Sequence, residues 1–148
     1  MKAGIVTCFL FASGVILLGV GSAILLAPEA FHASNGIVLE KKASLMSEIR
    51  APGGLLLASG LLILVASFRD RLRPQAVLLA TLVYGTFGLS RMLSLLIDGM
   101  PSTGIVGAIV IELLVAAFGL VILNRRFNSS PVGVQLTGVE DADADAAC

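Results

Sequence analysis

The stretch "APGGLLLASGLLILVASF", residues 51–68, runs for 18 residues without a charged side chain. An α-helix needs roughly 20 predominantly apolar residues to cross a hydrocarbon core about 30 Å thick, and an uncharged run of about this length is a candidate for such a helix. Soluble proteins carry about one charged residue in four, so they rarely contain such a run. The stretch therefore predicts a transmembrane helix.

Three other stretches share this composition, and they cover residues 4–27, 75–97 and 103–123. The whole chain is 57% hydrophobic and 14% charged, whereas soluble proteins are about 25% charged. The segments between the four stretches are too short for a second folded domain. We therefore expect an all-α fold, a polytopic membrane protein in which residues 1–124 form one four-helix transmembrane bundle.

The first stretch has a basic start at Lys2, as a secretory signal peptide would. Its apolar run, however, is longer than the roughly 7–15 residues of a typical signal-peptide core. The sequence therefore favours a retained helix over a cleaved leader.

Positively charged residues are unevenly divided between the two sides of the membrane that these spans define. Lys41, Lys42 and Arg50 fall on one side, and six residues fall on the other: Lys2, Arg69, Arg71, Arg73, Arg125 and Arg126. Because cytoplasmic loops carry the excess of lysine and arginine, both termini are expected in the cytoplasm. The first loop, residues 28–50, then faces outward.

This first loop contains a turn signal, Ser34-Asn35-Gly36. Apolar residues after the turn fall roughly on one helical face: Val38, Leu39, Leu45, Met46 and Ile49. A short helix lying in the membrane interface would suit this pattern. An irregular loop with scattered apolar residues explains it equally well, so both interpretations stay open.

The composition changes after Asn124, and residues 125–148 end in an acidic cluster of Glu140, Asp141, Asp143 and Asp145. Four carboxylates could bind a cation, but nothing in the segment would order them as ligands. We therefore expect a disordered acidic tail on the cytoplasmic side.

Two ionisable residues lie inside the predicted spans, Arg91 in the third and Glu112 in the fourth. A charge near the bilayer centre costs roughly 2.5–3.5 kcal/mol on insertion scales, so such residues face protein or water and take a partner. At about 1.5 Å per residue, Arg91 lies about 9 Å and Glu112 about 13 Å from the outer helix ends. The short connection makes the two helices antiparallel neighbours. We therefore expect an Arg91–Glu112 ion pair.

Further polar residues extend this cluster. Tyr84 and Asp98 share a helical face with Arg91, and Glu48 and Arg50 enter at the outer end of the second span. We expect Glu48, Arg50 and Asp98 to form the rim of an outward-facing pocket whose floor is Arg91 and Glu112. The alternatives are a purely structural polar network and, less favoured, a catalytic site.

Several classes of function find no support. The two cysteines, Cys8 and Cys148, give no disulfide framework or metal spacing. His32, the only histidine, is expected to be a solvated loop residue. No nucleophile with a base and no phosphate-binding loop is present, and the glycines of the spans suit helix packing. We therefore expect no cofactor and no metal, and the net charge of zero gives no argument for nucleic acid.

Four motifs together resemble one known family: "PEAF", "SEIRAPGGLLLASGLLIL", "GLSRMLSLLIDGMPS" and "IELLVAAFGLVIL". The family is a bacterial membrane family catalogued as domain of unknown function 4345, and the resemblance covers roughly residues 4–123. It implies four helices and, at matching positions, Glu48, Arg50, Gly53, Gly54, Gly88, Arg91, Asp98, Gly99, Pro101 and Glu112. It implies no activity.

Three functions fit a small protein of a bacterial inner membrane. The favoured one is an accessory or scaffold subunit that binds membrane proteins or lipid. The second is a carrier or binding protein for a small or amphipathic molecule in the Glu/Arg pocket, and the third is a lipid-modifying enzyme. Small residues, Gly54 with Ala58 and Ala108 with Ala116, allow close helix approach. They predict a homo-oligomer or a larger membrane complex.

Overall fold

A computed structural model describes residues 3–127 of the chain as five α-helices without any strand. The helices are α1 (Ala3–Leu26), α2 (Pro28–Ala33), α3 (Ala43–Ser67), α4 (Arg73–Asp98) and α5 (Thr103–Phe127). All except α2 are long and apolar enough to cross a membrane. The predicted all-α four-helix membrane bundle is confirmed. The predicted disordered tail falls mainly on residues 128–148, which lie outside the described residues.

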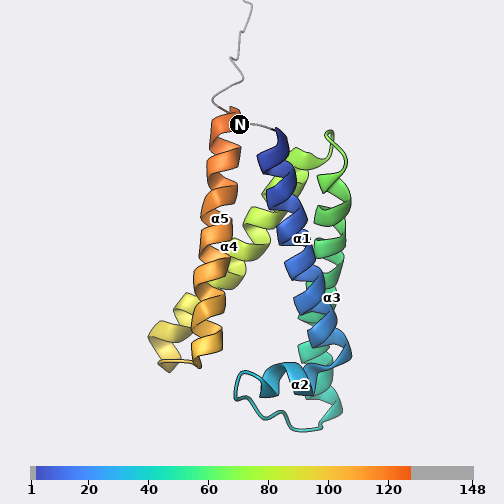
Figure 1. Ribbon diagram of the computed structural model, residues 1–148. Coiled ribbons are helices and arrows are strands. Elements are labelled where there is room, and N and C mark those ends of the chain that lie inside the picture. The colour runs from blue at the N-terminus through green and yellow to red at the C-terminus, as the bar shows by residue number, and fades with distance from the viewer. Residues whose placement is uncertain (1–2, 128–148) are drawn as a thin grey trace, which may run out of the picture.

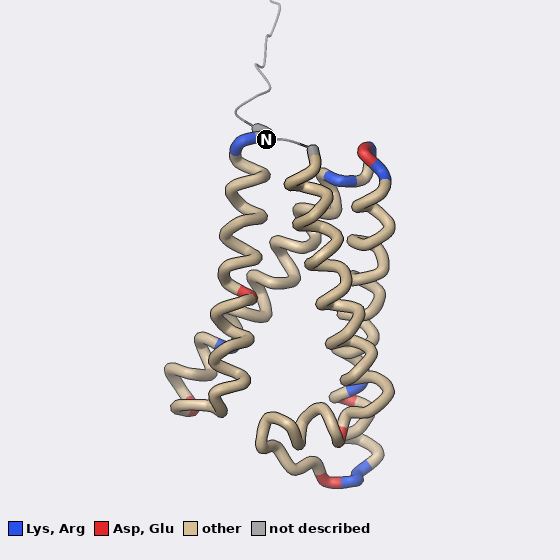
Figure 2. Tube along the Cα trace, viewed as in Figure 1, with Lys and Arg blue, Asp and Glu red and all other residues tan. Residues whose placement is uncertain are grey.

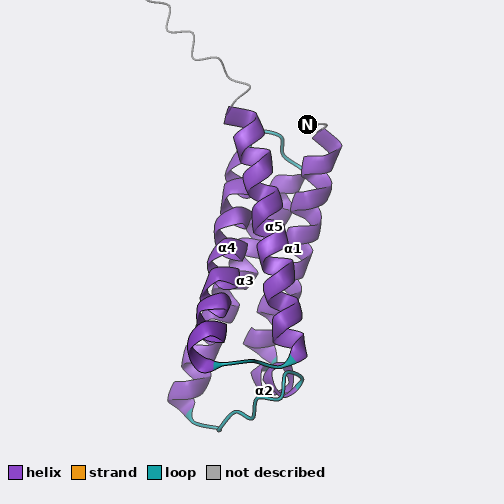
Figure 3. Cartoon of the chain, turned by 90° about the vertical axis from the view of Figure 1, so that its left-hand side faces the viewer, coloured by secondary structure: helices purple, strands orange, loops and turns teal. Residues whose placement is uncertain are grey.

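The long helices form two antiparallel pairs, α1 with α3 and α4 with α5 (Figures 1 and 3). The start of α1, the α3–α4 connection and the end of α5 lie at one end of the bundle, and α2 lies across the other end (Figure 1). The two pairs approach each other at the first end and diverge towards α2 (Figure 1). Helix α4 joins them, because it packs against α1 and α3 as well as against α5.

Glycines let α1 and α3 approach until their backbones touch. A Cβ atom added at Gly21 of α1 would lie 2.5 Å from the backbone nitrogen of Leu57 in α3. A Cβ added at Gly60 of α3 would lie 2.7 Å from the backbone nitrogen of Leu18 in α1. Without a strong hydrophobic force between helices in lipid, such close packing is a principal source of helix association. Gly14, Gly21, Gly53 and Gly60 therefore serve helix packing, as predicted, whereas a Cβ at Gly19 or Gly54 would meet nothing within 4 Å.

The end of the bundle opposite α2 is solidly packed. Leu10 of α1 and Ile63 of α3 are completely buried there, and Val77 of α4 is almost completely buried. Phe9 of α1 meets Phe118 of α5 with ring centroids 5.4 Å apart, a favourable separation for an aromatic pair. The two helix pairs are therefore held together at this end, which leaves the α2 end free to separate around a cavity.

The structure corrects the interpretation of the first loop. The second membrane span begins at Ala43, eight residues before the predicted start at residue 51, so Leu45, Met46 and Ile49 belong to the first two turns of α3. The short helix of this loop is α2, which precedes the turn. The Ser34-Asn35-Gly36 turn itself is confirmed, with Gly36 at a φ of 78°.

The predicted start at residue 51 was wrong because it followed the beginning of the uncharged run, after Arg50. The helix itself begins earlier and continues through the charged segment and through Pro52. Membrane helices tolerate an internal proline when neighbouring groups satisfy the freed backbone. Helix α3 therefore extends beyond its apolar part, and its first two turns carry Glu48 and Arg50.

Candidate functional site

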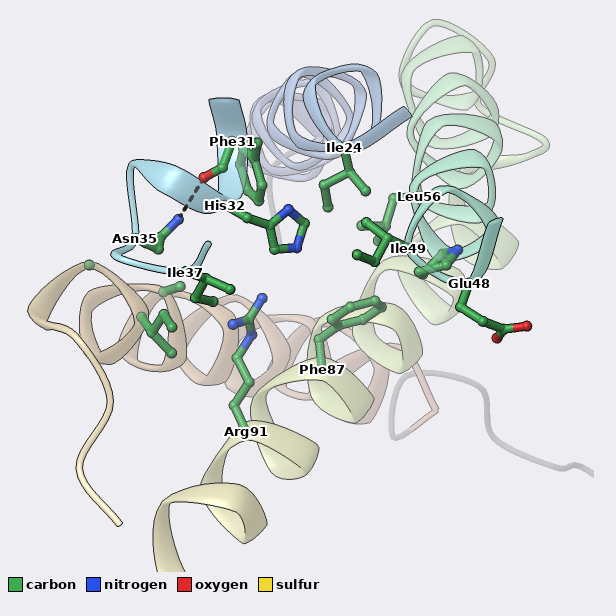
Figure 4. A pocket seen from close by; sticks show the side chains of 14 residues that line it. Ile24, Phe31, His32, Asn35, Ile37, Glu48, Ile49, Leu56, Phe87 and Arg91 are labelled. Carbon is green, nitrogen blue, oxygen red and sulfur yellow. Dashed lines mark hydrogen bonds between the residues drawn. The ribbon is translucent and has the colours of Figure 1, made fainter. Parts of the chain in front are cut away.

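A cavity of about 480 Å³ lies between the two helix pairs at the α2 end (Figure 4). We call it the outer chamber. Every helix contributes to its walls, with Ile24 from α1, Phe31 and His32 from α2, Ile49 from α3, Phe87 and Arg91 from α4, and Ile105 and Ala108 from α5. Its walls are mostly apolar, with a few polar side chains among them, as is usual for ligand pockets of about 300–1,000 Å³.

A second cavity of about 190 Å³, the inner chamber, adjoins the outer one. The two chambers share Ile24, Leu56, Phe87, Arg91 and Ala108 in their walls. The inner chamber is also lined by Ile16 of α1 and Ile111 of α5, whose side chains are 42% and 52% exposed. Because both lie on the outside of the bundle, the inner chamber reaches the lipid-facing surface between α1 and α5.

Arg91 and Glu112 meet where the two chambers join. The Nε atom of Arg91 lies 3.3 Å from Oε1 of Glu112, with side chains 34% and 14% exposed. Glu112 lies near the middle of α5, and Arg91 lies about two turns before the end of α4. Within residues 3–127, Arg91 Nε and Glu112 Oε2 are buried without a hydrogen-bond partner. The pair is thus only partly satisfied by the protein.

Gly88 explains why the two side chains can reach each other. It lies one turn before Arg91 on α4, and a Cβ there would come within 2.9 Å of the Leu113 side chain and 3.3 Å of Glu112 Cβ. The missing side chain at Gly88 gives Leu113 and Glu112 room to lie directly against α4. Gly88 and Arg91 are three residues apart and so share one helical face, and that face packs against α5.

Tyr84 ties α4 to α1. Its hydroxyl donates a hydrogen bond of 2.9 Å to the backbone carbonyl of Ser13, and its side chain is buried beside the inner chamber. The hydroxyl therefore uses its donor hydrogen within the protein. Tyr84 holds the wall of the inner chamber in place, whereas Arg91 projects into the cavity.

Replacing Tyr84 with phenylalanine removes this hydrogen bond and keeps the ring. We expect the free energy of unfolding in detergent to fall by about 0.5–1.5 kcal/mol, the usual net value of one hydrogen bond. Thermal unfolding of the variant beside the wild type checks this. A matched Thr86→Val change should have a smaller effect, because the Thr86 hydroxyl only bonds carbonyls of its own helix. An unchanged unfolding temperature in Tyr84→Phe would contradict the assignment.

The structure separates the residues of the predicted rim. Glu48 lines the outer chamber, but its carboxylate points away from Arg91 (Figure 4). Arg50 is exposed beside Leu25 and Gly54, outside both chambers. Residues two positions apart on a helix do not face the same way. Because α3 includes both residues, Glu48 lies beside the cavity and Arg50 faces away from it. Asp98 is exposed at the end of α4 and accepts a hydrogen bond of 2.8 Å from Ser94.

His32, which the sequence suggested was solvated, is instead half-buried in the wall of the outer chamber. Its Nδ1 atom lies 2.8 Å from the carbonyl oxygen of Pro28. Because a carbonyl can only accept, Nδ1 carries the proton of this bond and Nε2 is left for other partners. The proline that begins α2 four residues earlier is the sequence signal that could have placed His32 on a short helix.

The turn after α2 closes the outer chamber against α5. Asn35 donates a hydrogen bond of 3.2 Å to the carbonyl of Phe31. Its Oδ1 atom would lie 2.8 Å from a Cβ added at Gly104, in the first turn of α5. The missing side chain at Gly104 therefore lets the turn rest on α5 and cover the end of the cavity.

The chambers offer apolar walls and a few polar side chains for recognition: His32, Asn35, Glu48, Tyr84, Arg91 and Glu112. Among the described residues, no group of three or more His, Cys, Asp or Glu side chains could hold a metal ion. The arrangement resembles a pocket for a molecule with a polar head and an apolar part.

Comparison with known proteins gives a family. No curated protein and no solved structure matches the chain. Residues 5–123 match the model of a family described as a domain of unknown function (DUF4345). The match reaches from the first turn of α1 to the last turns of α5 and so includes both chambers. The chain therefore belongs to the DUF4345 family.

Proposed function

We propose that this protein is a carrier or binding protein that takes up an amphipathic membrane molecule in its two chambers. One observation carries the proposal. The cavity has a polar part around Arg91 and an apolar part that opens to the lipid-facing surface at Ile16 and Ile111. A lipid could place its head beside Arg91 and leave its chain in the opening between α1 and α5, without crossing water.

The surroundings of the Arg91–Glu112 pair favour a binding site over a purely structural ion pair. A structural ion pair within a membrane is satisfied when all its donors and acceptors are bound. Here Glu112 Oε2 is buried without a partner among the residues that the structure describes. Arg91 also lines both chambers. A buried carboxylate oxygen that no described protein group binds, at the junction of two cavities, gives a ligand an acceptor to bind.

Lipid analysis of the purified protein tests the proposal. Replacing Ala108 with phenylalanine fills space in both chambers, because Ala108 lines both. The matched control is Val110→Phe on the same helix, where the side chain is 53% exposed to the surroundings of the bundle. We expect the wild type and Val110→Phe to retain about one lipid per chain through extraction in mild detergent, and Ala108→Phe to retain less than a tenth of that. Equal retention in all three would overturn the proposal.

The site belongs, on this proposal, to the outer leaflet of a bacterial inner membrane. The end of the bundle opposite α2 carries the larger number of positive residues (Figure 2), and such ends lie in the cytoplasm. The α2 end and its chambers would then face outward, with both termini of the chain inside.

Accessibility of single cysteines checks this orientation. In a background without Cys8 and Cys148, cysteines at Arg71 and Ser102 lie in loops at opposite ends of the bundle. An impermeant thiol reagent added to intact spheroplasts is expected to label position 102 and leave position 71 unlabelled until the cells are opened. The reverse pattern would place the chambers on the cytoplasmic side.

An accessory subunit or homo-oligomer is the second candidate, and one surface favours it. Gly54 of α3 faces open space, and Ala58, one turn later, is exposed, so another helix could approach closely there. The other predicted pair of small residues does not contribute, because Ala108 lines the chambers and Ala116 is buried near Gly85. A disulfide-linked dimer formed by a cysteine at Ala58, but not by one at the exposed Val110 of α5, would support this candidate.

A further inference from the structure

We propose that the head group of the bound molecule is zwitterionic, with an anionic phosphate on Arg91 and an ammonium group that donates hydrogen bonds to Glu112. The inference rests on the proposed function and names the substrate class of the same site. Its basis is the pairing of one guanidinium and one carboxylate, each with unused hydrogen-bonding capacity, at the junction of the chambers.

Charge balance decides against a head group with a net charge. Arg91 and Glu112 already neutralise each other at a separation of 3.3 Å. A purely anionic head would add an uncompensated charge to a site with mostly apolar walls, and burying such a charge is costly. A head group with one positive and one negative charge leaves the site neutral and provides a partner for each protein charge.

Hydrogen bonding points to the same head group. Glu112 Oε2 is a buried acceptor that needs a donor, and an ammonium group supplies several. Arg91 faces Glu112 through Nε, so its two terminal nitrogens remain for another acceptor. Figure 4 shows the guanidinium reaching into the outer chamber. A phosphate is a strong partner for these donors, because its oxygens accept parallel bonds from guanidinium.

The other charges at the α2 end do not alter this balance. Lys41 pairs with Glu29 at 3.3 Å, and Lys42 pairs with Glu40 at 2.5 Å, all on exposed side chains. The carboxylate of Glu48 points away from Arg91 (Figure 4). Arg50 is exposed outside both chambers. Within the part of the chain that the structure describes, Arg91 is therefore the only lysine or arginine that lines the chambers.

The arrangement of the two chambers matches the parts of a lipid with a zwitterionic head group. Arg91 lines both chambers, whereas Glu112 lines the inner one. The phosphate would lie at the junction, the ammonium group beside Glu112, and the chain between Ile16 and Ile111. A single-chain phospholipid with an ethanolamine head carries these groups in the required combination, and it is the probe that the site predicts.

Binding of three probes with the same acyl chain tests the inference. They are lysophosphatidylethanolamine, which is zwitterionic with N–H donors, lysophosphatidylcholine, which is zwitterionic without them, and the anionic lysophosphatidylglycerol. Binding to the delipidated protein in neutral detergent is followed by native mass spectrometry. We expect lysophosphatidylethanolamine to bind at least tenfold more tightly than lysophosphatidylglycerol, with lysophosphatidylcholine between them. Equal or tighter binding of the anion would overturn the inference, whereas failure of all three to bind would count against the proposed function itself.

A change at Glu112 reverses the expected order. Glu112→Gln removes one charge and leaves Arg91 as a lone cation, so lysophosphatidylglycerol should become the preferred probe by about tenfold. Asp98→Asn, an equivalent change outside both chambers, should keep the wild-type order. Unchanged preference in Glu112→Gln would overturn the assignment of the ammonium group to Glu112. If that variant fails to fold, the order of the probes on the wild type still decides the inference.

Discussion

Replacing Arg91 with leucine is expected to lower the free energy of unfolding in detergent by about 2.5–3.5 kcal/mol, the cost of an uncompensated charge in a membrane span on insertion scales. The change leaves the Glu112 carboxylate alone, and that side chain is only 14% exposed. Replacing Glu112 with leucine should cost less. The surviving Arg91 is 34% exposed, and its long side chain can move its charge towards water.

The double replacement should recover part of this loss, because no charge is then left without a partner. We expect a coupling free energy of about 0.5–3 kcal/mol, the usual range for residues in contact. Unfolding of the four proteins of this cycle is measured in the same detergent, with Arg50→Leu as the control for loss of an arginine outside both chambers. Additive single changes would mean that the two side chains do not interact. A stable double variant that binds no lipid would separate the structural contribution of the pair from its role in binding.

Replacing Gly21 with alanine should have the other large effect. The added methyl group would lie 2.5 Å from the backbone nitrogen of Leu57 and 2.9 Å from the carbonyl oxygen of Gly53. Backbone atoms cannot move aside as a flexible side chain can, so α1 and α3 would have to separate. We expect a loss of about 1–3 kcal/mol or more, as for other overpacked interiors, measured as a lower unfolding temperature.

Gly19→Ala is the matched control for this change. Gly19 lies two residues away on the same helix, and a Cβ there would meet nothing within 4 Å. Alanine is also a better helix former than glycine by roughly 0.5–1 kcal/mol. The control should therefore be neutral or slightly stabilising. A similar loss in both variants would mean that α1 and α3 do not pack through Gly21.

The sequence predicted the fold because membrane spans follow from long apolar runs, and all four runs are helices in the structure. It also placed Arg91 and Glu112 at similar depths, because a short connection leaves adjacent helices antiparallel. Which of the other charged residues face the cavity depended on the rotation of each helix about its own axis. Glu48 and Arg50 are two residues apart, and only the early start of α3 determines which of them faces the cavity.

His32 and the second chamber could not be predicted for a different reason. His32 reaches the cavity through a six-residue helix that begins at Pro28 and through the turn that follows it. The packing of Asn35 against Gly104 holds that turn in place, and the two residues are far apart in sequence. The inner chamber exists because α1 and α5 diverge, and no local pattern in either helix specifies an absence of contact.

The division into two helix pairs suggests an order in which the helices pack during synthesis of the chain. Each pair is a hairpin of long helices that follow one another along the chain, α1 with α3 and then α4 with α5. Contacts within a hairpin require little loop-closure entropy and form early. The first hairpin can therefore pack before α4 has left the ribosome, and the second hairpin docks afterwards through α4. Since both chambers take residues from both hairpins, the chambers are complete only after the last step of assembly.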